Sequence, residues 1–195
     1  MADNKVQYGL KNIYYSKITK TESGLEYAKP VAWPGAKSLK IDPSGDTNTF
    51  YADDMAYFTT SSANGYSGTL EVAEIPESVL IDVFGYEKSE NGMTVEVSNA
   101  QTADIALLFE CQGDVKARRH IFFQVTLGRP GFEANTKEDK TDPDTKSLDI
   151  TVTPIKVDDR EITKAAASKG DPAYDTFFTT APTAPTFKAA AGAGA

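Results

Sequence analysis

The hydrophobic residues of this chain recur mostly at every second position, in short runs separated by glycine, proline and asparagine. The alternation is most regular from Ser147 to Val157, and Ser67–Glu74 shows the same period around Leu70 and Val72. A period of two predicts strands with one buried face. Many short strands between turn residues predict a mainly β chain, a β-sandwich or barrel with one or two short helices and long loops.

Other strand signals share aromatic or β-branched residues bounded by turn residues. They lie at Tyr8–Ile18, Tyr27–Trp33, Ser38–Ile41, Asn48–Thr60, Tyr86–Lys88, Met93–Val97, Lys116–Leu127 and Ile162–Ala167. The sequence Glu90-Asn91-Gly92 predicts a hairpin turn between two of these strands. The apolar run Ala103–Cys111 fits either a strand or a short helix, because periodicity alone does not separate the two.

The segment Gly65–Tyr86 carries a boundary signal at each joint. Asn64-Gly65 favours a tight turn before the strand, since both residues tolerate positive φ. Pro76 suits the first position of a helix, where its missing N–H would have no partner. Gly85 predicts a left-handed helix end. Between these two signals, four apolar residues follow at helical spacing, namely Val79, Leu80, Val83 and Phe84.

Three segments differ from this strand pattern. Gly128–Lys146 is rich in Asp, Lys, Thr and Pro and predicts an extended loop, and Asp171–Phe178 predicts a capped short helix. Residues 181–195 are low in complexity and predict a flexible Ala/Pro/Gly-rich tail. We therefore expect one β domain at residues 1–180, with an N-terminal arm and long loops, followed by a tail at 181–195.

Composition narrows the classes of partner. The chain has 195 residues, 40% of them hydrophobic, which is enough to bury a core. A net charge of −8 argues against a surface that grips nucleic acid, although nucleic acid can pass an acidic wall without adhering. No segment approaches the roughly 20 apolar residues of a membrane span. The single cysteine, Cys111, excludes an internal disulfide and lies in an apolar run, where we expect a buried, inert thiol.

Groups that support catalysis or metal binding are sparse. The only histidine, His120, follows two arginines, which would lower its basicity. One cysteine and one histidine do not make a structural zinc site. Asp42–Asn48 and Asp139–Asp144 resemble calcium loops but lack the required spacing of ligands, and no phosphate-binding glycine motif is present. We expect no enzyme activity, no catalytic residue, no cofactor and no metal site.

One basic cluster stands out in this acidic chain. Lys116–His120 predicts a charged edge strand, which would either discourage stray strand pairing or meet an acidic neighbour in an assembly. The acidic side chains that another copy could supply are Asp53, Asp54, Glu71, Glu74 and Glu77.

Several segments together resemble the major tail proteins of long-tailed bacteriophages, the phi13-type family. The resemblance is carried by the opening Tyr8–Tyr15 (YGLKNIYY), the turn and strand Gly65–Glu71 (GYSGTLE), the helix end at Val83–Gly85 and the strand Arg118–Phe123. It covers about residues 6 to 165 and lies in motifs that are structural rather than catalytic.

This resemblance implies a tail tube subunit, a β-sandwich that assembles as stacked hexameric rings around a channel for DNA ejection. Strands of six subunits would join into one barrel that lines the channel, with loops and arms reaching the next ring. Its partners would be other copies of itself and the tape measure, tail terminator and distal tail proteins. The virion tail would be assembled in the host bacterial cytoplasm. The candidate stacking segments are Pro30–Thr49 and Gly128–Lys146.

Two other classes remain open. Another virion or surface β-sandwich, such as a capsid decoration or carbohydrate-binding module, would expose aromatic residues such as Trp33, Tyr51 and Tyr57. A hydrolase with paired acids would use Asp53, Asp54 or Glu71, although carboxylates without a pocket usually form a solvated face. A tube subunit would instead bury these aromatic residues or place them at subunit contacts.

Overall fold

The structure, a computed structural model of the chain, describes residues 9–22, 24–45, 47–52, 55–61, 65–132 and 144–187. In this part of the chain, strands dominate and one short helix is present, which confirms the mainly β prediction. The elements in chain order are β1 (Leu10–Thr21), β2 (Gly24–Tyr27), β3 (Val31–Ala32), β4 (Ala36–Pro43), β5 (Thr47–Ala52), β6 (Met55–Ser61), β7 (Tyr66–Val72), α1 (Glu77–Asp82), β8 (Glu87–Lys88), β9 (Thr94–Val95), β10 (Ile105–Cys111), β11 (Arg119–Leu127), β12 (Lys146–Val152), β13 (Ile155–Val157), β14 (Arg160–Ile162) and β15 (Lys164–Ala167).

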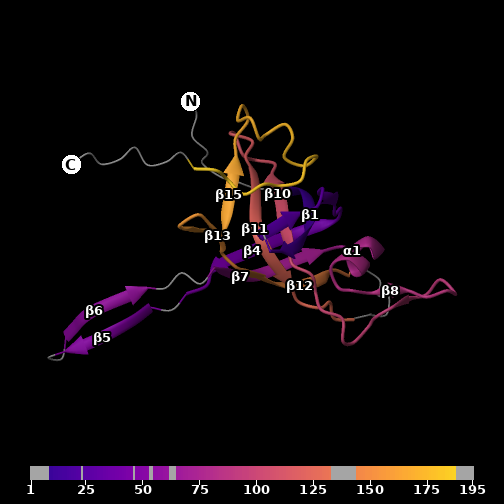
Figure 1. Cartoon of the computed structure of the whole chain (residues 1–195), viewed down its shortest axis with the longest axis horizontal. Helices are drawn as coiled ribbons and strands as arrows, with labels where there is room; N and C mark the ends of the chain where they lie inside the picture. Colours follow the sequence, from indigo (N-terminus) through magenta and orange to yellow (C-terminus); the bar gives the residue numbers. More distant parts are fainter. Residues whose placement is uncertain are drawn as a thin grey trace, which may run out of the picture.

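One large antiparallel sheet organises the molecule (Figure 1). Its strand order is β2-β1-β10-β11-β12-β7-β4, with β15 also paired to β11 and β3 also paired to β1. The consecutive strands β3 and β4 hydrogen-bond to β1 and β7, which lie near opposite ends of this order. The sheet therefore curls on itself, and the short link between β3 and β4 connects its two sides.

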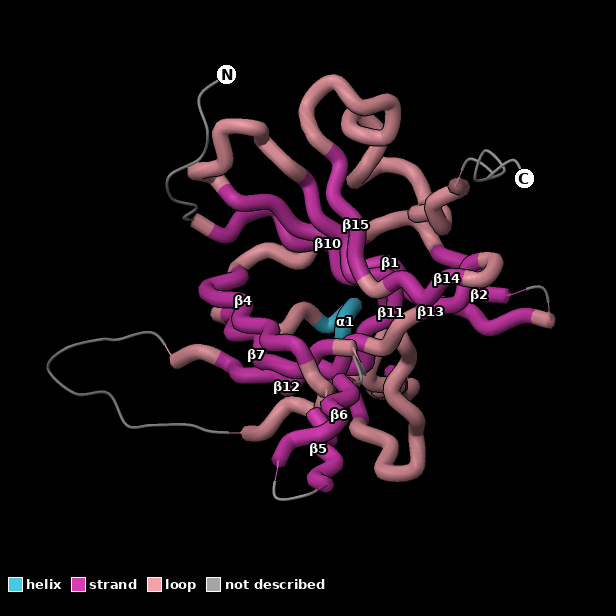
Figure 2. Tube along the Cα trace, turned by 90° about the vertical axis from the view of Figure 1, so that its left-hand side faces the viewer, coloured by secondary structure: helices cyan, strands magenta, loops and turns pink. Residues whose placement is uncertain are grey.

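The inner face of the curled sheet holds the larger apolar cluster, which we call the inner core. Its largest buried side chains are Trp33, Tyr15 and Phe84, and the predicted core residues Leu70 and Val72 are fully buried there. The helix α1 packs against this face and lies within the curve of the sheet in Figure 2. The helix thus fills the space that the curvature would otherwise leave empty.

The opposite face holds a second apolar cluster, the outer core, built on β10, β11 and β13. It contains Ala106, Leu108, Ile121, Phe123 and Ile155. The irregular segment of residues 171–187, which we call the strap, covers it with Phe177, Phe178 and Ala184. The run Ala103–Cys111 is accordingly a strand that is buried on both faces, which explains its continuous apolar sequence.

The turn–strand–helix reading of Gly65–Tyr86 is confirmed, with small shifts at the ends of the helix. Pro76 stands one residue before α1, and α1 ends at Asp82. Gly85 has φ +70°, and a Cβ at this position would lie 2.8 Å from the Cβ of Ala100. Glycine is needed at this position because the backbone is left-handed and because a Cβ would be too close to Ala100.

Several predicted elements differ from the structure; Tyr27–Trp33, for example, contains only the last residue of β2 and the short β3. The long strand Ser147–Val157 is divided into β12 and β13, because Pro154 lacks the N–H that a continuous ladder requires. Asp171–Phe178 forms successive turns rather than a helix. Asp171 does accept a backbone N–H, that of Ser168 at 2.6 Å. However, Phe177 and Phe178 pack on the outer core of the sheet, and the segment does not form a helix.

The predicted hairpin at Glu90–Gly92 is present: β8 pairs with β9 across a turn that contains Gly92 at φ +85°. The strand signal at Asn48–Thr60 corresponds to two strands, β5 and β6, which pair with each other as a second hairpin. Asp53, Asp54 and residues 133–143 of the predicted long loop lie outside the described residues. Residues 181–187 continue the strap and 188–195 lie outside the description, so the division at residue 181 stays a prediction.

Candidate assembly surfaces

The outer strands of the large sheet have unpaired edges within the described chain. β4 and β2 stand at the two ends of the strand order. Along β4 the exposed residues include Lys37, Lys40 and Asp42, and Pro43 closes the strand. Charges and a terminal proline are typical of an edge that avoids indiscriminate pairing while it keeps free N–H and C=O groups for a chosen partner.

β4 is held in close register on β7. A Cβ on Gly68 would lie 1.9 Å from the carbonyl oxygen of Lys40, so only glycine allows the two backbones to approach this closely. Three residues farther along β7, Glu71 binds Lys37 Nζ at 2.6 Å and the hydroxyl groups of Ser38 and Thr145. These contacts, with the Lys37 hydrogen bond as the largest cause, lower the pKa of Glu71 to about 2.

The predicted charged edge strand is wrong. β11 lies inside the sheet, and Arg119 sits between Glu110 of β10 and Ala167 of β15. Its Nε lies 3.3 Å from Glu110 Oε2, while Arg118 Nε donates to Asp114 at 2.7 Å. Both arginines already bind acidic groups of their own chain, which removes the basis for the predicted pairing with another copy.

Glu74 and Glu77, the other predicted acidic residues that the structure describes, are also engaged within the chain. Glu77 accepts from Lys88 at 2.7 Å and from Thr94, and its pKa is lowered chiefly by the Lys88 contact. Glu74 accepts the backbone N–H of Ile75 at 3.3 Å and also provides the carbonyl oxygen that binds Trp33. Glu77 and Glu74 therefore bind lysine, hydroxyl and backbone donors of their own chain.

The single histidine and the single cysteine lie in separate structural settings. His120 stacks on Phe109 with ring centroids 5.3 Å apart, and burial, followed by the charge of Arg118, lowers its pKa. Cys111 is half-buried rather than buried, and burial together with the charge of Asp114 raises its pKa. Neither group is positioned beside a partner that would activate a nucleophile.

Of the three aromatic residues named for the carbohydrate-binding alternative, the structure describes the side chain of Trp33. Trp33 is buried, meets Tyr15 edge to face at 6.2 Å, and donates its Nε1–H to the carbonyl oxygen of Glu74 at 3.3 Å. The side chains of Tyr51 and Tyr57 lie outside the description. Trp33 is thus part of the core, as expected for a tube subunit.

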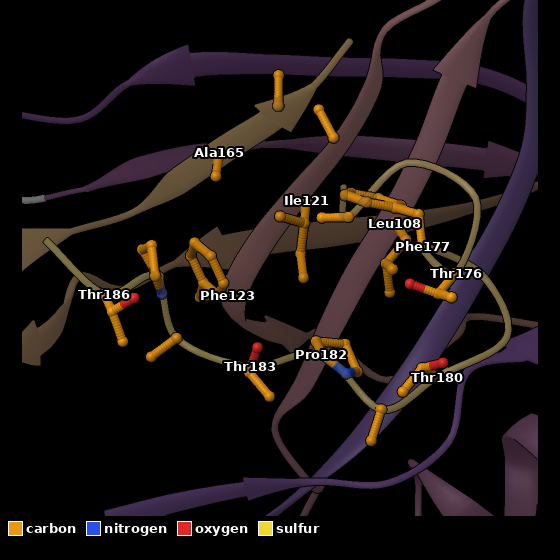
Figure 3. A pocket seen from close by; sticks show the side chains of 16 residues that line it. Leu108, Ile121, Phe123, Ala165, Thr176, Phe177, Thr180, Pro182, Thr183 and Thr186 are labelled. Carbon is orange, nitrogen blue, oxygen red and sulfur yellow. The ribbon is translucent and has the colours of Figure 1, made fainter. Parts of the chain in front are cut away.

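A groove lies between the strap and the sheet (Figure 3). It has a volume of about 490 Å³ and is lined by Leu108, Ile121 and Phe123 on the sheet side and by Phe177, Pro182 and several threonines on the strap side. The lining holds no acid, base or thiol, so the groove offers packing surface rather than a reaction centre.

No group of three or more potential metal ligands occurs among the described residues. Asp42 and Ser44 of the first calcium-like loop are described, whereas residues 139–143 of the second are not. Across the same described ranges, no helix is long and apolar enough to cross a membrane.

The most distinctive surface feature is a projecting hairpin. β5 and β6 leave the body between β4 and β7 and extend well beyond the large sheet (Figure 1). Among the described strands they pair only with each other, with Phe50 opposite Phe58 and Ala52 opposite Met55. The sequence predicted strand structure at Asn48–Thr60, but it gave no sign that this region would form a hairpin that stands apart from the large sheet among the described strands.

The fold is thus a curled antiparallel sheet with unpaired edges among the described strands, from which one hairpin projects (Figure 1). The family model described as "Phage tail tube protein" matches residues 2–184. The chain belongs to this family and is a structural protein of the phage virion tail, which confirms the resemblance seen in the sequence. No curated protein sequence matched the chain.

Proposed function

We propose that this chain is the major subunit of a non-contractile tail tube, polymerising as stacked hexameric rings into a hollow conduit for DNA ejection. The observation that carries the proposal is the family match over residues 2–184, combined with a curled sheet whose outer strands β4 and β2 have edges that no other described strand pairs with. Joining such edges between neighbouring subunits satisfies their backbone groups and closes a ring.

The charge of the chain suits passage of DNA without adhesion. The chain carries a net charge of −8, and the arginines of its only basic cluster are bound to Glu110 and Asp114. Because like charges repel, such a wall keeps phosphates from binding, and specific contacts to DNA are not required for a conduit.

The proposed partners follow from this role. The subunit binds other copies of itself within and between rings, and at the ends of the tube it meets the tape measure, tail terminator and distal tail proteins. It functions in the virion tail after synthesis and assembly in the host cytoplasm. Its role is mechanical, without enzyme activity, cofactor or metal.

A decoration or carbohydrate-binding β-sandwich is the alternative. The burial of Trp33 favours the tube subunit, because a sugar platform needs an exposed aromatic face.

Negative-stain electron microscopy of the purified protein distinguishes the two functions. We expect rings or tubes with a central hole at high protein concentration. A protein that remains monomeric at high concentration and binds immobilised glycans would contradict the proposal.

A further inference from the structure

The strap covers the outer face without joining the sheet. Its backbone hydrogen bonds, as far as the structure describes them, close turns within residues 168–180. The groove of about 490 Å³ lies beneath its second half, where Pro182 and Thr183 lie across from Ile121 and Phe123 (Figure 3). A segment without a strand ladder to the sheet depends on side-chain contacts to stay closed.

A row of charged residues crosses the sheet beneath the start of the strap, and we call it the charged row. Lys11 of β1 lies opposite Glu110 of β10, and Glu110 lies opposite Arg119 of β11. Glu110 Oε1 is 3.3 Å from Lys11 Nζ, and Glu110 Oε2 is 3.3 Å from Arg119 Nε. Because strand residues two positions apart share a face, Leu108 and Ile121 of the outer core place this row on the outer face.

Arg119 joins the charged row to the strap. Its guanidinium lies 4.0 Å from the ring centroid of Tyr174 and 4.8 Å from that of Phe178, and it donates to the carbonyl oxygen of Tyr174 at 2.5 Å. The side chains of Arg119 and Glu110 are 21% and 10% exposed, so little water is available to replace these contacts. The position of Arg119 therefore governs how firmly the first half of the strap is held on the sheet.

A bulge in β1 provides a further contact for Glu110. The register of β1 on β10 shifts between Lys11 and Tyr14, and Asn12 adopts a left-handed backbone with φ +52°. Such a bulge redirects a side chain, and here Asn12 Nδ2 donates to Glu110 Oε1 at 2.5 Å. Burial alone would raise the pKa of Glu110, but the hydrogen bonds from Asn12 and Lys11 lower it below its ordinary value, which keeps the carboxylate charged beside Arg119.

We infer that the charged row is a latch that couples the start of β1 to the strap. Asn12 and Lys11 orient the carboxylate of Glu110. Glu110 in turn orients Arg119, whose guanidinium holds the strap. A displacement of the start of β1 takes Asn12 away from Glu110, loosens Arg119 and lets the strap open above the groove. Because Gly9, where the described chain begins, is three residues before Asn12, a contact made at that end of the chain would change the exposure of the outer core.

Hydrogen exchange of the unassembled protein, measured at single amides, tests the coupling. Asn12→Gly removes the amide donor and keeps the left-handed backbone, whereas Asn12→Asp keeps the shape of the side chain and replaces the donor with a carboxylate. The control, Lys17→Ala, changes an exposed residue of the same strand. The amides followed are those of Phe177, Thr179 and Thr180 in the turns of the strap, with the amides of β12 as the reference for the inner core.

Both Asn12 variants should speed exchange of the strap amides by roughly fivefold, because a charged group loses a hydrogen bond and the strap opens more often. Exchange in β12 should change by less than about twofold, and Lys17→Ala should leave the strap unaffected. Strap exchange that matches the unmodified protein, or that rises by the same factor as exchange in β12, would overturn the inference.

A double-mutant cycle separates a latch from independent contacts. Arg119→Met removes the guanidinium and should by itself speed strap exchange by roughly thirtyfold. Adding Asn12→Gly should then change little, because the coupling passes through Arg119. Factors that multiply to roughly 150-fold would show independent contacts and would overturn the inference.

A second background covers the case in which Arg119→Met does not fold. Phe178→Ala removes a ring that Arg119 contacts on the strap. Asn12→Gly should accelerate exchange of the strap less in this background than in the unmodified chain. An undiminished effect of Asn12→Gly would contradict the latch.

Discussion

The two faces of the large sheet are covered in different ways. The inner core is closed by the curvature of the sheet and by α1, and its largest side chains, Trp33, Tyr15 and Phe84, are fully buried. The outer core is covered by the irregular strap, with a groove of about 490 Å³ left between strap and sheet. The difference indicates that the inner core specifies the fold, whereas the outer face is closed only by a loosely packed segment.

The strap is held by a few aromatic and cationic contacts rather than by a strand ladder. Phe178 stacks on Tyr14 with ring centroids 4.6 Å apart, and the guanidinium of Arg119 lies 4.0 Å from the ring centroid of Tyr174. Arg119 also donates to the carbonyl oxygen of Tyr174 at 2.5 Å. Such point contacts permit local opening at a lower free energy than unfolding of the inner core.

The largest expected effect is on the inner core. Leu148→Ala should lower the free energy of unfolding by about 3–5 kcal/mol, and Leu108→Ala in the outer core by about 2 kcal/mol, because the groove beside Leu108 lets its surroundings collapse more readily. Urea denaturation of unassembled protein, followed by circular dichroism, gives both values. Equal losses at the two positions would contradict the proposed difference between the faces.

A smaller effect is expected in the strap. Phe178→Ala removes the stacking on Tyr14 and the contact with Arg119 at 4.8 Å, and should cost about 1–2 kcal/mol. It should also speed proteolysis between residues 171 and 187 while the body stays intact, which mass spectrometry of the fragments would detect. Thr180→Ala, an exposed change in the same segment, is the control and should leave the cleavage rate unchanged.

A substitution under the outer face should stabilise the protein. The hydroxyl of Tyr27 is buried and has no hydrogen-bond partner among the described residues. Tyr27→Phe removes this unsatisfied group and should raise the free energy of unfolding by up to about 1 kcal/mol. Thermal unfolding by calorimetry gives the sign, and a lower melting temperature in the variant would mean that the hydroxyl group has a partner in solution.

Tyr27 also provides a test at high pH. Burial raises its pKa to about 12 from the ordinary value of 10.0. Because the folded pKa is the higher one, this contribution to stability is complete below pH 10 and is lost as the pH rises toward 12. Tyr27→Phe should therefore lose less stability than the unmodified protein over that interval.

The smallest effect is expected from Glu71 on the solvent side of β7. Its pKa is lowered from 4.5 to about 2, so its contribution is present above pH 4.5 and is lost as the pH falls toward 2. Glu71→Gln should make the stability less dependent on pH across this interval. Denaturant titrations at several pH values measure the slope, and an unchanged slope would mean that Lys37 and Thr145 do not hold the carboxylate in solution.

Local signals in the sequence predicted part of the fold well. Pro76 and Gly85 mark the ends of a helix through their own backbone chemistry, and Leu70 and Val72 mark the buried face of β7, so no distant contact is needed to identify them. β10 could not be assigned from its pattern because both its faces are buried: Ile105 and Leu107 face the inner core, and Ala106 and Leu108 face the outer core.

Contacts between distant residues account for the predictions that were wrong. The charged residues Lys116–His120 are typical of an edge strand. In the fold, however, Arg119 lies between Glu110 of β10 and Ala167 of β15, so β11 is an inner strand. Asp171–Phe178 has a helix-like start, but contacts of Tyr174 and Phe178 with Arg119 and Tyr14 hold it as turns. Likewise, strand alternation in the β5–β6 and β8–β9 hairpins predicts strands but not that both hairpins project from the body.

Cryo-electron microscopy of assembled protein tests the central claim most directly. The tube function predicts a hollow particle of stacked rings, six subunits to a ring, with strands of neighbouring subunits joined at the edges of the large sheet around the channel. Closed dimers or monomers without a channel, at concentrations where the protein is folded, would contradict it.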